Sequence, residues 1–263
     1  MRILAFDTAT RATAVALAGP EGELLEARDD PPPGTRPRHA TRLLPLAAEL
    51  LEQAGIGFGD VERIAVGVGP GTFTGLRVGV ATAKALALAG GIPLVGVSTL
   101  QSLALVAVPA PPGAGGPAPA PAGAGADAVA ADAPATPGAG ADAVTAVLDA
   151  RRSEVFAAAW RVSDLLAGSC PLLGPSALSP QALSDALRDL GGSILAVGEG
   201  AVEFRSVLKR SGAFVPDNGS ALHRVTAAGH CRIARHLHPS DLDRIRPQYL
   251  RLPDAEIRAT GQQ

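Results

Sequence analysis

The stretch Gly67–Arg77, with the sequence GVGPGTFTGLR, constrains the fold of this chain more than any other. The apolar run that leads into it is typical of a buried strand. Residues 69–71, Gly-Pro-Gly, then predict a sharp turn, because proline fixes φ and glycine supplies positive φ. Either Thr72 or Thr74 is expected to cap a helix over about residues 74–89. The pattern therefore predicts a strand, a tight turn and a helix.

Small residues recur every four positions along this helix, at Gly75, Gly79 and Ala83. A glycine inside a helix costs roughly 1 kcal/mol relative to alanine, so the two glycines need a compensating contact. A row of small residues lets another backbone come very close, as in the small-residue stripes of membrane helices. This face could pack on the chain's own sheet or receive a partner helix, and the spacing alone leaves both alternatives open.

The elements around this stretch predict a mixed α/β fold. Three strands joined by short turns, an antiparallel meander, are expected over residues 2–7, 13–18 and 23–27. Apolar residues at helical spacing then predict a helix over residues 39–54. A strand over residues 93–97 and a helix capped by Ser98 or Thr99 complete the order βββαβαβα. That order predicts a sheet with an antiparallel start and parallel crossovers.

The second half of the chain reads as a shorter copy of the first. Strands are expected over residues 144–149, 154–160 and 193–197, and helices over residues 179–190, 202–209 and 221–236. Residues 109–142 between the halves are nearly all Ala, Gly and Pro, which predicts a flexible insertion. The expected domains are residues 1–108, completed by a C-terminal helix over 221–238, and a smaller domain of residues 143–220, followed by a tail of residues 239–263.

Composition excludes several classes of protein. The net charge of −2, without a basic and aromatic stripe, predicts weak binding of tRNA by the isolated chain. The two cysteines, Cys170 and Cys231, cannot build a disulfide framework, which favours a reducing cytoplasm. We expect no signal peptide and no contact with a membrane, since no apolar run is long enough to span one.

Several stretches, in the same order along the chain, resemble the bacterial TsaB (YeaZ) family: Asp7–Thr10, His39–Pro45, Gly67–Arg77, Gly96–Leu100, Leu148–Phe156 and Pro247–Arg251. The resemblance implies a two-domain actin-like (ASKHA, RNase H-like) α/β fold with mixed sheets flanked by helices. It also implies an accessory, non-catalytic role in forming N6-threonylcarbamoyladenosine at position 37 of tRNAs that read codons starting with A.

The resemblance further implies a set of partners. A TsaD-type subunit would carry the catalysis, a TsaE-type ATPase would join the complex, and tRNA would be contacted only through that complex. On this basis the partner interface is predicted to comprise residues of the central helix and its start: Thr72, Phe73, Gly75, Leu76, Arg77, Gly79, Val80 and Ala83. A Gly79→Leu chain is accordingly expected to fold and to lose the partner. Whether the chain forms a homodimer when alone stays open, as does the place of ATP or ADP within the complex.

The candidate phosphate-binding and metal-binding sites lack residues that such sites need. An actin-like ATPase needs an aspartate followed by a glycine-bearing hairpin that wraps phosphates, whereas Asp7, Thr8 and Thr10 lie in a turn without glycine. The catalytic relatives hold a metal with His-x-x-x-His on the first helix, but here His39 is followed at that spacing by Leu43. No cofactor, metal or catalytic residue is therefore assigned to this chain alone. The alternative, an independent actin-like kinase or ATPase, is disfavoured by the same two features.

Overall fold

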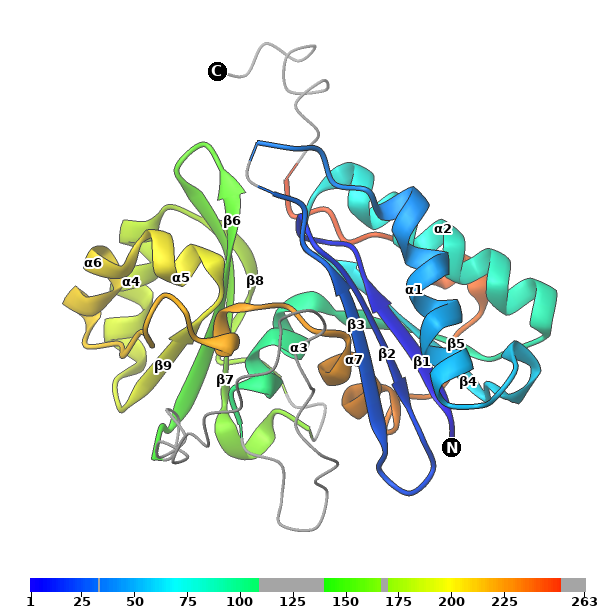
Figure 1. The fold of residues 1–263 in the computed structure, drawn as a ribbon. Coiled ribbons are helices and arrows are strands. Elements are labelled where there is room, and N and C mark those ends of the chain that lie inside the picture. The colour runs from blue at the N-terminus through cyan, green and yellow to red at the C-terminus, as the bar shows by residue number, and fades with distance from the viewer. Residues whose placement is uncertain (33, 109–139, 167–169, 252–263) are drawn as a thin grey trace, which may run out of the picture.

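A computed structural model describes residues 1–32, 34–108, 140–166 and 170–251 of the chain. Two mixed sheets face each other across a central layer of helices, and further helices cover the outer face of each sheet (Figure 1). The predicted α/β class with mixed sheets and flanking helices is confirmed. The predicted insertion, residues 109–142, lies outside the described residues except for its last three positions.

The first sheet has the strand order β3-β2-β1-β4-β5. Its strands are β1 Ile3–Asp7, β2 Thr13–Ala18, β3 Leu24–Asp29, β4 Arg63–Gly69 and β5 Leu94–Ser98. The predicted meander is confirmed, because β1, β2 and β3 pair antiparallel, and β4 and β5 then join in parallel. Parallel neighbours need crossover helices, which are α1 His39–Gln53 and α2 Phe73–Gly90.

Alternation along β1 divides the core into two layers. Leu4 and Phe6 point to one face of the sheet, where they pack with α1 and α2. Ile3 and Ala5 point to the other face, toward α3 Thr99–Val106 and α7 Ala227–Ala234. A strand that is buried on both faces reads as a continuous apolar run, which explains why the sequence shows no alternation here.

The second sheet has the order β8-β7-β6-β9, with β6 Ala143–Arg151, β7 Glu154–Arg161, β8 Leu173–Leu178 and β9 Ile194–Val197. Its inner face shares one apolar cluster with α3, α7 and the first sheet, to which Leu148 and Trp160 contribute. Its outer face packs against α4 Pro180–Leu190, α5 Glu199–Glu203 and α6 Arg205–Leu208. The copy of the first half is more complete than predicted, since both sheets begin with a three-stranded meander.

Three elements of the structure differ from the prediction. The strand β8 was not predicted, because Gly174 and Pro175 lower its strand propensity. Both residues are tolerated, since β8 is an edge strand. The helix expected over residues 202–209 begins earlier, at Glu199, and breaks at Phe204, whose φ of −102° and ψ of 27° leave the helical region. The last helix is shorter than residues 221–236, since the backbone is extended from Arg224 to Thr226.

Helix starts follow the predicted chemistry in part. Ser98 and Ser179 are N-caps whose hydroxyls accept backbone N–H groups, from Gln101 and Ala182 respectively. Thr72 occupies the N-cap position of α2, but its side chain makes no capping bond, and Thr74 lies inside the helix. The short 3-10 turns are Phe58–Asp60, Val162–Asp164, Lys209–Ser211, Ala221–His223 and Leu242–Arg244.

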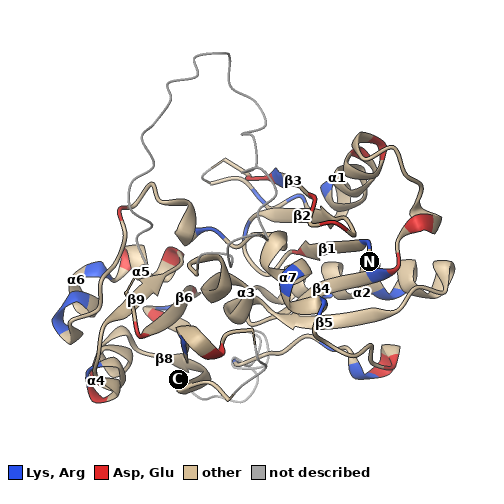
Figure 2. Ribbon diagram, turned by 90° about the horizontal axis from the view of Figure 1, so that it is seen from below, with Lys and Arg blue, Asp and Glu red and all other residues tan. Residues whose placement is uncertain are grey.

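Charged residues lie mainly on the outer helices and the loops, with both signs on α1 and α4 (Figure 2). The strands between them carry few charges, as expected for sheets that are covered on both faces. Among the described helices, none combines the length and the apolar character needed to span a membrane.

Candidate functional site

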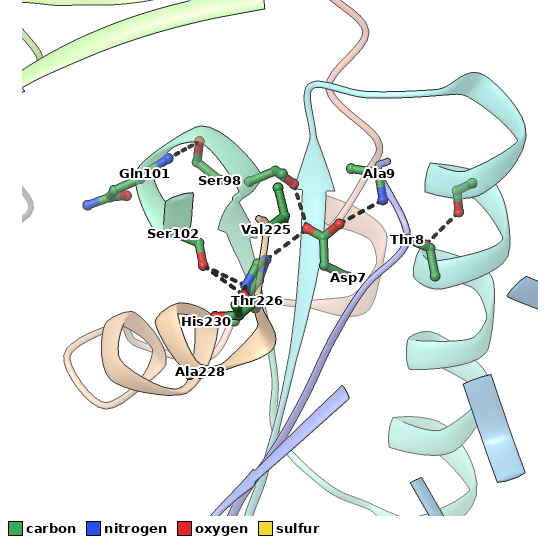
Figure 3. A network of polar contacts seen from close by, with 12 residues as sticks. Asp7, Thr8, Ala9, Ser98, Gln101, Ser102, Val225, Thr226, Ala228 and His230 are labelled. Carbon is green, nitrogen blue, oxygen red and sulfur yellow. Dashed lines mark hydrogen bonds and ion pairs between the residues drawn. The ribbon is translucent and has the colours of Figure 1, made fainter. Parts of the chain in front are cut away.

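A buried polar network surrounds the end of β1 (Figure 3). The carboxylate of Asp7 is 1% exposed and meets three donors. Its Oδ1 accepts the backbone N–H of Ala9 at 2.7 Å, and its Oδ2 accepts the Thr99 hydroxyl at 2.7 Å. The Nε2 atom of His230, on α7, lies 3.0 Å from the same Oδ2. Asp7 therefore ties β1 to the two central helices α3 and α7.

The other face of the His230 ring meets α3. Its Nδ1 atom lies 2.8 Å from the Ser102 hydroxyl and 3.2 Å from the carbonyl oxygen of Thr226. The order carboxylate, imidazole, hydroxyl has the chemistry of a nucleophilic triad. All three side chains are at most 1% exposed, however, so no substrate can reach the hydroxyl. The network is a structural link between elements and not an active site.

Opposing effects set the pKa of Asp7. Burial raises the pKa of this carboxyl, but the hydrogen bond and the charge of His230, with the bonds from Thr99 and Ala9, outweigh burial. The pKa of Asp7 consequently lies below its ordinary value, and the side chain is a carboxylate at neutral pH. Space for the pair comes from Gly67, where an added Cβ would lie 1.9 Å from Oδ2 of Asp7.

Asp7 and Thr8, two of the three residues predicted to bind phosphate, are turned away from solvent. Thr8 is fully buried and donates its hydroxyl to the carbonyl oxygen of Gly75 at 2.7 Å. Asp7 has both oxygens engaged by the protein itself. Thr10 is half-buried and lines the two hollows described below. Sequence inspection missed Thr99, Ser102 and His230, since no local pattern connects residues so distant in the chain.

The second sheet repeats the Asp7 turn. Oδ1 of Asp149 accepts the backbone N–H of Arg151 at 2.7 Å, as Oδ1 of Asp7 accepts that of Ala9. The hairpin then continues through three residues with positive φ, namely 65° at Arg151, 55° at Arg152 and 59° at Ser153. None of the three is glycine, so the hairpin stores local strain. The matching turns support the internal duplication inferred from the sequence.

Two hollows lie between these turns and share Thr10, Leu148 and Glu199 in their walls. One has a volume of about 120 Å³ and is lined by both turns; the other measures about 300 Å³ and extends toward His223. Limited access of water raises the pKa of Glu199, and the negative charge of Asp149 raises it further. The walls carry both signs of charge, because Arg11 and Arg151 also line the smaller hollow and Arg28 and Arg224 line the larger one.

The small-residue face of α2 is occupied by the chain itself, which corrects its assignment to a partner. An added Cβ at Gly75 would lie 2.0 Å from the carbonyl oxygen of Thr8, and one at Gly79 would lie 2.3 Å from the Thr8 hydroxyl. Ala83 is fully buried in the core of the first sheet. Close approach was correctly predicted, but the approaching backbone is that of the β1–β2 turn.

The other residues predicted for the interface divide into two groups. Leu76 and Val80 are buried in the chain's own core. Thr72 and Phe73 are half-buried and Arg77 is exposed. The guanidinium carbon of Arg77 lies 3.8 Å from the centre of the Phe73 ring, which in turn lies 5.0 Å from the ring of Tyr249. The start of α2 is therefore the accessible part of the predicted set.

His39 and His223 are both engaged by other parts of the chain. His39 is buried rather than exposed, its Nδ1 atom lies 2.9 Å from the Thr13 hydroxyl, and burial lowers its pKa. His223 accepts the backbone N–H of Gly198 through Nδ1 and contacts the carbonyl oxygen of Pro216 through Nε2. Within the described parts of the chain, no three His, Cys, Asp or Glu side chains gather closely enough to hold a metal ion.

Comparison with known structures finds YeaZ from Pseudomonas aeruginosa, with 27% identity and a TM-score of 0.66 over 95% of this chain and 99% of that chain. A second match is an uncharacterised P. aeruginosa protein with similarity to peptidase YeaZ, with 27% identity, a TM-score of 0.68 and the same coverage. The chain is therefore similar to YeaZ (TsaB) along almost its whole length. Its actin-like two-sheet architecture is that of these neighbours.

A family model also matches part of the chain. The model describes TsaD, the tRNA N6-adenosine threonylcarbamoyltransferase, and it matches residues 31–128. Within the described residues that segment includes α1, β4, α2, β5 and α3, the elements that carry the central turn. No curated protein sequence matches the chain. The similarity to YeaZ thus extends along almost the whole chain, while the match to the TsaD model is confined to residues 31–128.

Proposed function

We propose that this TsaB-like chain is a non-catalytic subunit that binds and supports a TsaD-type threonylcarbamoyltransferase. The reaction is the formation of N6-threonylcarbamoyladenosine at position 37 of tRNAs that read codons starting with A. The similarity to YeaZ and the match to the TsaD family model support this assignment. The cytoplasm is the proposed location, because tRNA is modified there and the two described cysteines are free thiols.

One observation carries the non-catalytic part of the proposal. The carboxylate of Asp7, which an actin-like ATPase would use toward its metal and phosphates, is buried and engaged by Ala9, Thr99 and His230. A carboxylate in this state cannot also bind a cation or order an attacking water. We therefore propose that ATP turnover in the complex belongs to the TsaE-type ATPase and that this chain alone binds no nucleotide.

The partner surface that we propose is the outward face of α2. Most of its exposed positions are small or apolar and recur at helical spacing, namely Thr74, Ala81, Ala85, Leu88 and Ala89, and Arg77 is exposed near its start. Leu88 is 76% exposed, and Leu44 on the neighbouring α1 is 49% exposed. Exposed apolar side chains on two adjacent helices suit a helical partner. The TsaD-type subunit is the proposed occupant, and a second copy of the chain is the competing one.

The test combines activity with partner binding. The purified chain should not turn over ATP, and modification of tRNA should appear only after the TsaD-type and TsaE-type subunits and the threonylcarbamoyl donor are added. An Ala85→Arg variant should stay folded but bind the TsaD-type subunit at least tenfold more weakly, a loss of about 1.4 kcal/mol. Ala182→Arg, an equally exposed site on α4, is the matched control.

Two results would contradict the proposal. ATP turnover by the chain alone would favour the alternative of an independent actin-like kinase or ATPase. Full-strength binding by Ala85→Arg would place the interface elsewhere on the molecule. Binding of tRNA by the isolated chain is expected to be weak, since the net charge is −2. Tight binding at physiological salt would assign the tRNA contacts to this subunit instead of its partner.

A further inference from the structure

The segment Pro247–Arg251 runs along the gap between the two sheets, and in Figure 1 it is the red end of the described chain, between β6 and α2. It is anchored on the first half of the molecule. The backbone N–H of Gln248 donates to the carbonyl oxygen of Val68 at 2.7 Å. The Tyr249 ring stacks on Phe73, and Nε of Arg77 donates to the Tyr249 hydroxyl at 3.2 Å.

The other end of the segment is anchored on the second half. Nη1 of Arg251 donates to the carbonyl oxygen of Ala150 at 2.9 Å and lies 3.1 Å from Oε2 of Glu154. Ala150 is in β6 and Glu154 begins β7, so Arg251 binds both strands of one hairpin. Charge-assisted bonds from a guanidinium group are stronger than neutral ones, and this guanidinium is mostly shielded from water.

The two anchors are also the two walls of the smaller hollow. Gly71 and Thr72 line it from the turn that precedes Phe73, while Leu148, Asp149 and Arg151 line it from the hairpin that Arg251 holds. Any widening of the hollow must move the hairpin away from the turn. Such a movement breaks either the stacking of Tyr249 or the two contacts of Arg251, because only two residues separate the anchors Gln248 and Arg251.

We propose that Pro247–Arg251 is a strap that holds the cleft between the two halves at a fixed width. The central helices α3 and α7 lie between the sheets, so a hinge there would displace the tip of the β6–β7 hairpin most. Arg251 binds at that tip, where a hydrogen bond opposes the largest displacement of the hairpin. Proteins with two lobes commonly open and close around ligands by hinge motion, and the strap opposes the opening movement. The proposal does not depend on the partner or on tRNA.

The cleft width can be measured between spin labels on the outer helices. Labels are attached to Glu52→Cys on α1 and Asp189→Cys on α4, both exposed, in a chain that carries Cys170→Ser; Cys231 is buried. Pulsed electron paramagnetic resonance then gives the distribution of distances. Arg251→Ala should lengthen the mean distance and broaden the distribution. Arg246→Ala is the matched control, since Arg246 lies in the same tail and, among the described residues, bonds to the nearby carbonyl oxygen of Asp243 and not to the second half.

If the segment acts as a strap, the loss of either anchor should widen the cleft. Tyr249→Ala should shift the distribution in the same direction as Arg251→Ala, whereas a purely local role of Arg251 predicts no effect of Tyr249. Glu154→Gln keeps the size of the side chain and removes its charge, so it replaces Arg251→Ala if that variant fails to fold. Distributions for Arg251→Ala and Tyr249→Ala that superimpose on that of the parent chain would overturn the proposal.

Discussion

Replacing Gly79 by alanine tests the contact between helix α2 and the β1–β2 turn. In an exposed helix this change would stabilise by about 1 kcal/mol, because alanine has the higher helix propensity. Here the new Cβ would lie 2.3 Å from the hydroxyl of Thr8, a fully buried side chain that donates to Gly75. Overpacking costs about 1–3 kcal/mol, and displacing the hydroxyl loses a hydrogen bond that contributes about 1 kcal/mol. Gly79→Ala should therefore destabilise the chain by about 1–3 kcal/mol.

A second substitution makes the sign of the effect diagnostic. Thr8→Ala removes the hydroxyl that the new Cβ would meet, and the remaining Cβ of residue 8 lies at an ordinary 3.6 Å. In that background Gly79→Ala should become neutral or stabilising by up to about 1 kcal/mol. Gly75→Ala should show no such rescue, because its Cβ would meet the backbone oxygen of Thr8 at 2.0 Å.

Unfolding in urea, followed by circular dichroism and by fluorescence of Trp160, the single tryptophan, measures each free energy. If Gly79→Ala stabilises the chain with Thr8 present, the small-residue face of α2 has room for a side chain, and the inferred close contact with Thr8 is wrong. The structure also corrects the expectation that Gly79→Leu folds normally: the larger side chain should destabilise more than alanine. Loss of partner binding in that variant would follow from misfolding and would not locate an interface.

Three further predictions concern pH, thiols and the insertion. The lowered pKa of Asp7 means that its contribution to stability is present above the ordinary carboxyl pKa of about 4 and is lost as the pH falls through its lower folded-state pKa. Asp7→Asn should accordingly flatten the fall in the free energy of unfolding below about pH 4; an unchanged pH dependence would remove Asp7 from that role. The exposed thiol of Cys170 should react with a disulfide reagent in the folded chain, whereas Cys231, buried with its pKa raised to about 12, should react only on unfolding, and equal rates would be inconsistent with this burial. Replacing residues 109–139 by a short Gly-Ser linker should leave the urea midpoint nearly unchanged, provided that Asp142 stays, since its carboxylate accepts the backbone N–H of Ser193 at 2.9 Å; a large drop in the midpoint would contradict the composition argument.

Local patterns predicted the elements whose signals are strong. The apolar run of β1, the helical spacing of α1 and the Ser-Pro start of α4 each agree with their structure to within about two residues. The edge strand β8 was missed because Gly174 and Pro175 are weak strand formers whatever their surroundings. Propensity describes one segment at a time, so it fails where an edge position tolerates poor residues.

Contacts between segments that are distant in the chain could not be predicted from the sequence. The spacing of Gly75 and Gly79 correctly indicated a close approach, but the occupant, Thr8, comes from another element. In the same way Asp7 was recognised as a candidate phosphate-binding residue, but no local pattern connected it to His230, whose Nε2 atom lies 3.0 Å from its Oδ2. Periodicity reports which face of a helix is close to something, and only the fold determines what that neighbour is.

The central layer of α3 and α7 belongs to both sheets at once. Apolar residues from the first sheet, such as Ile3, and from the second, such as Leu148 and Leu195, bury themselves in the same cluster around those helices. A gene fragment that encoded residues 1–108 alone would leave one side of α3 uncovered and would lack α7 entirely. Neither half should therefore fold stably by itself, because each half supplies only part of the wall of one shared interior.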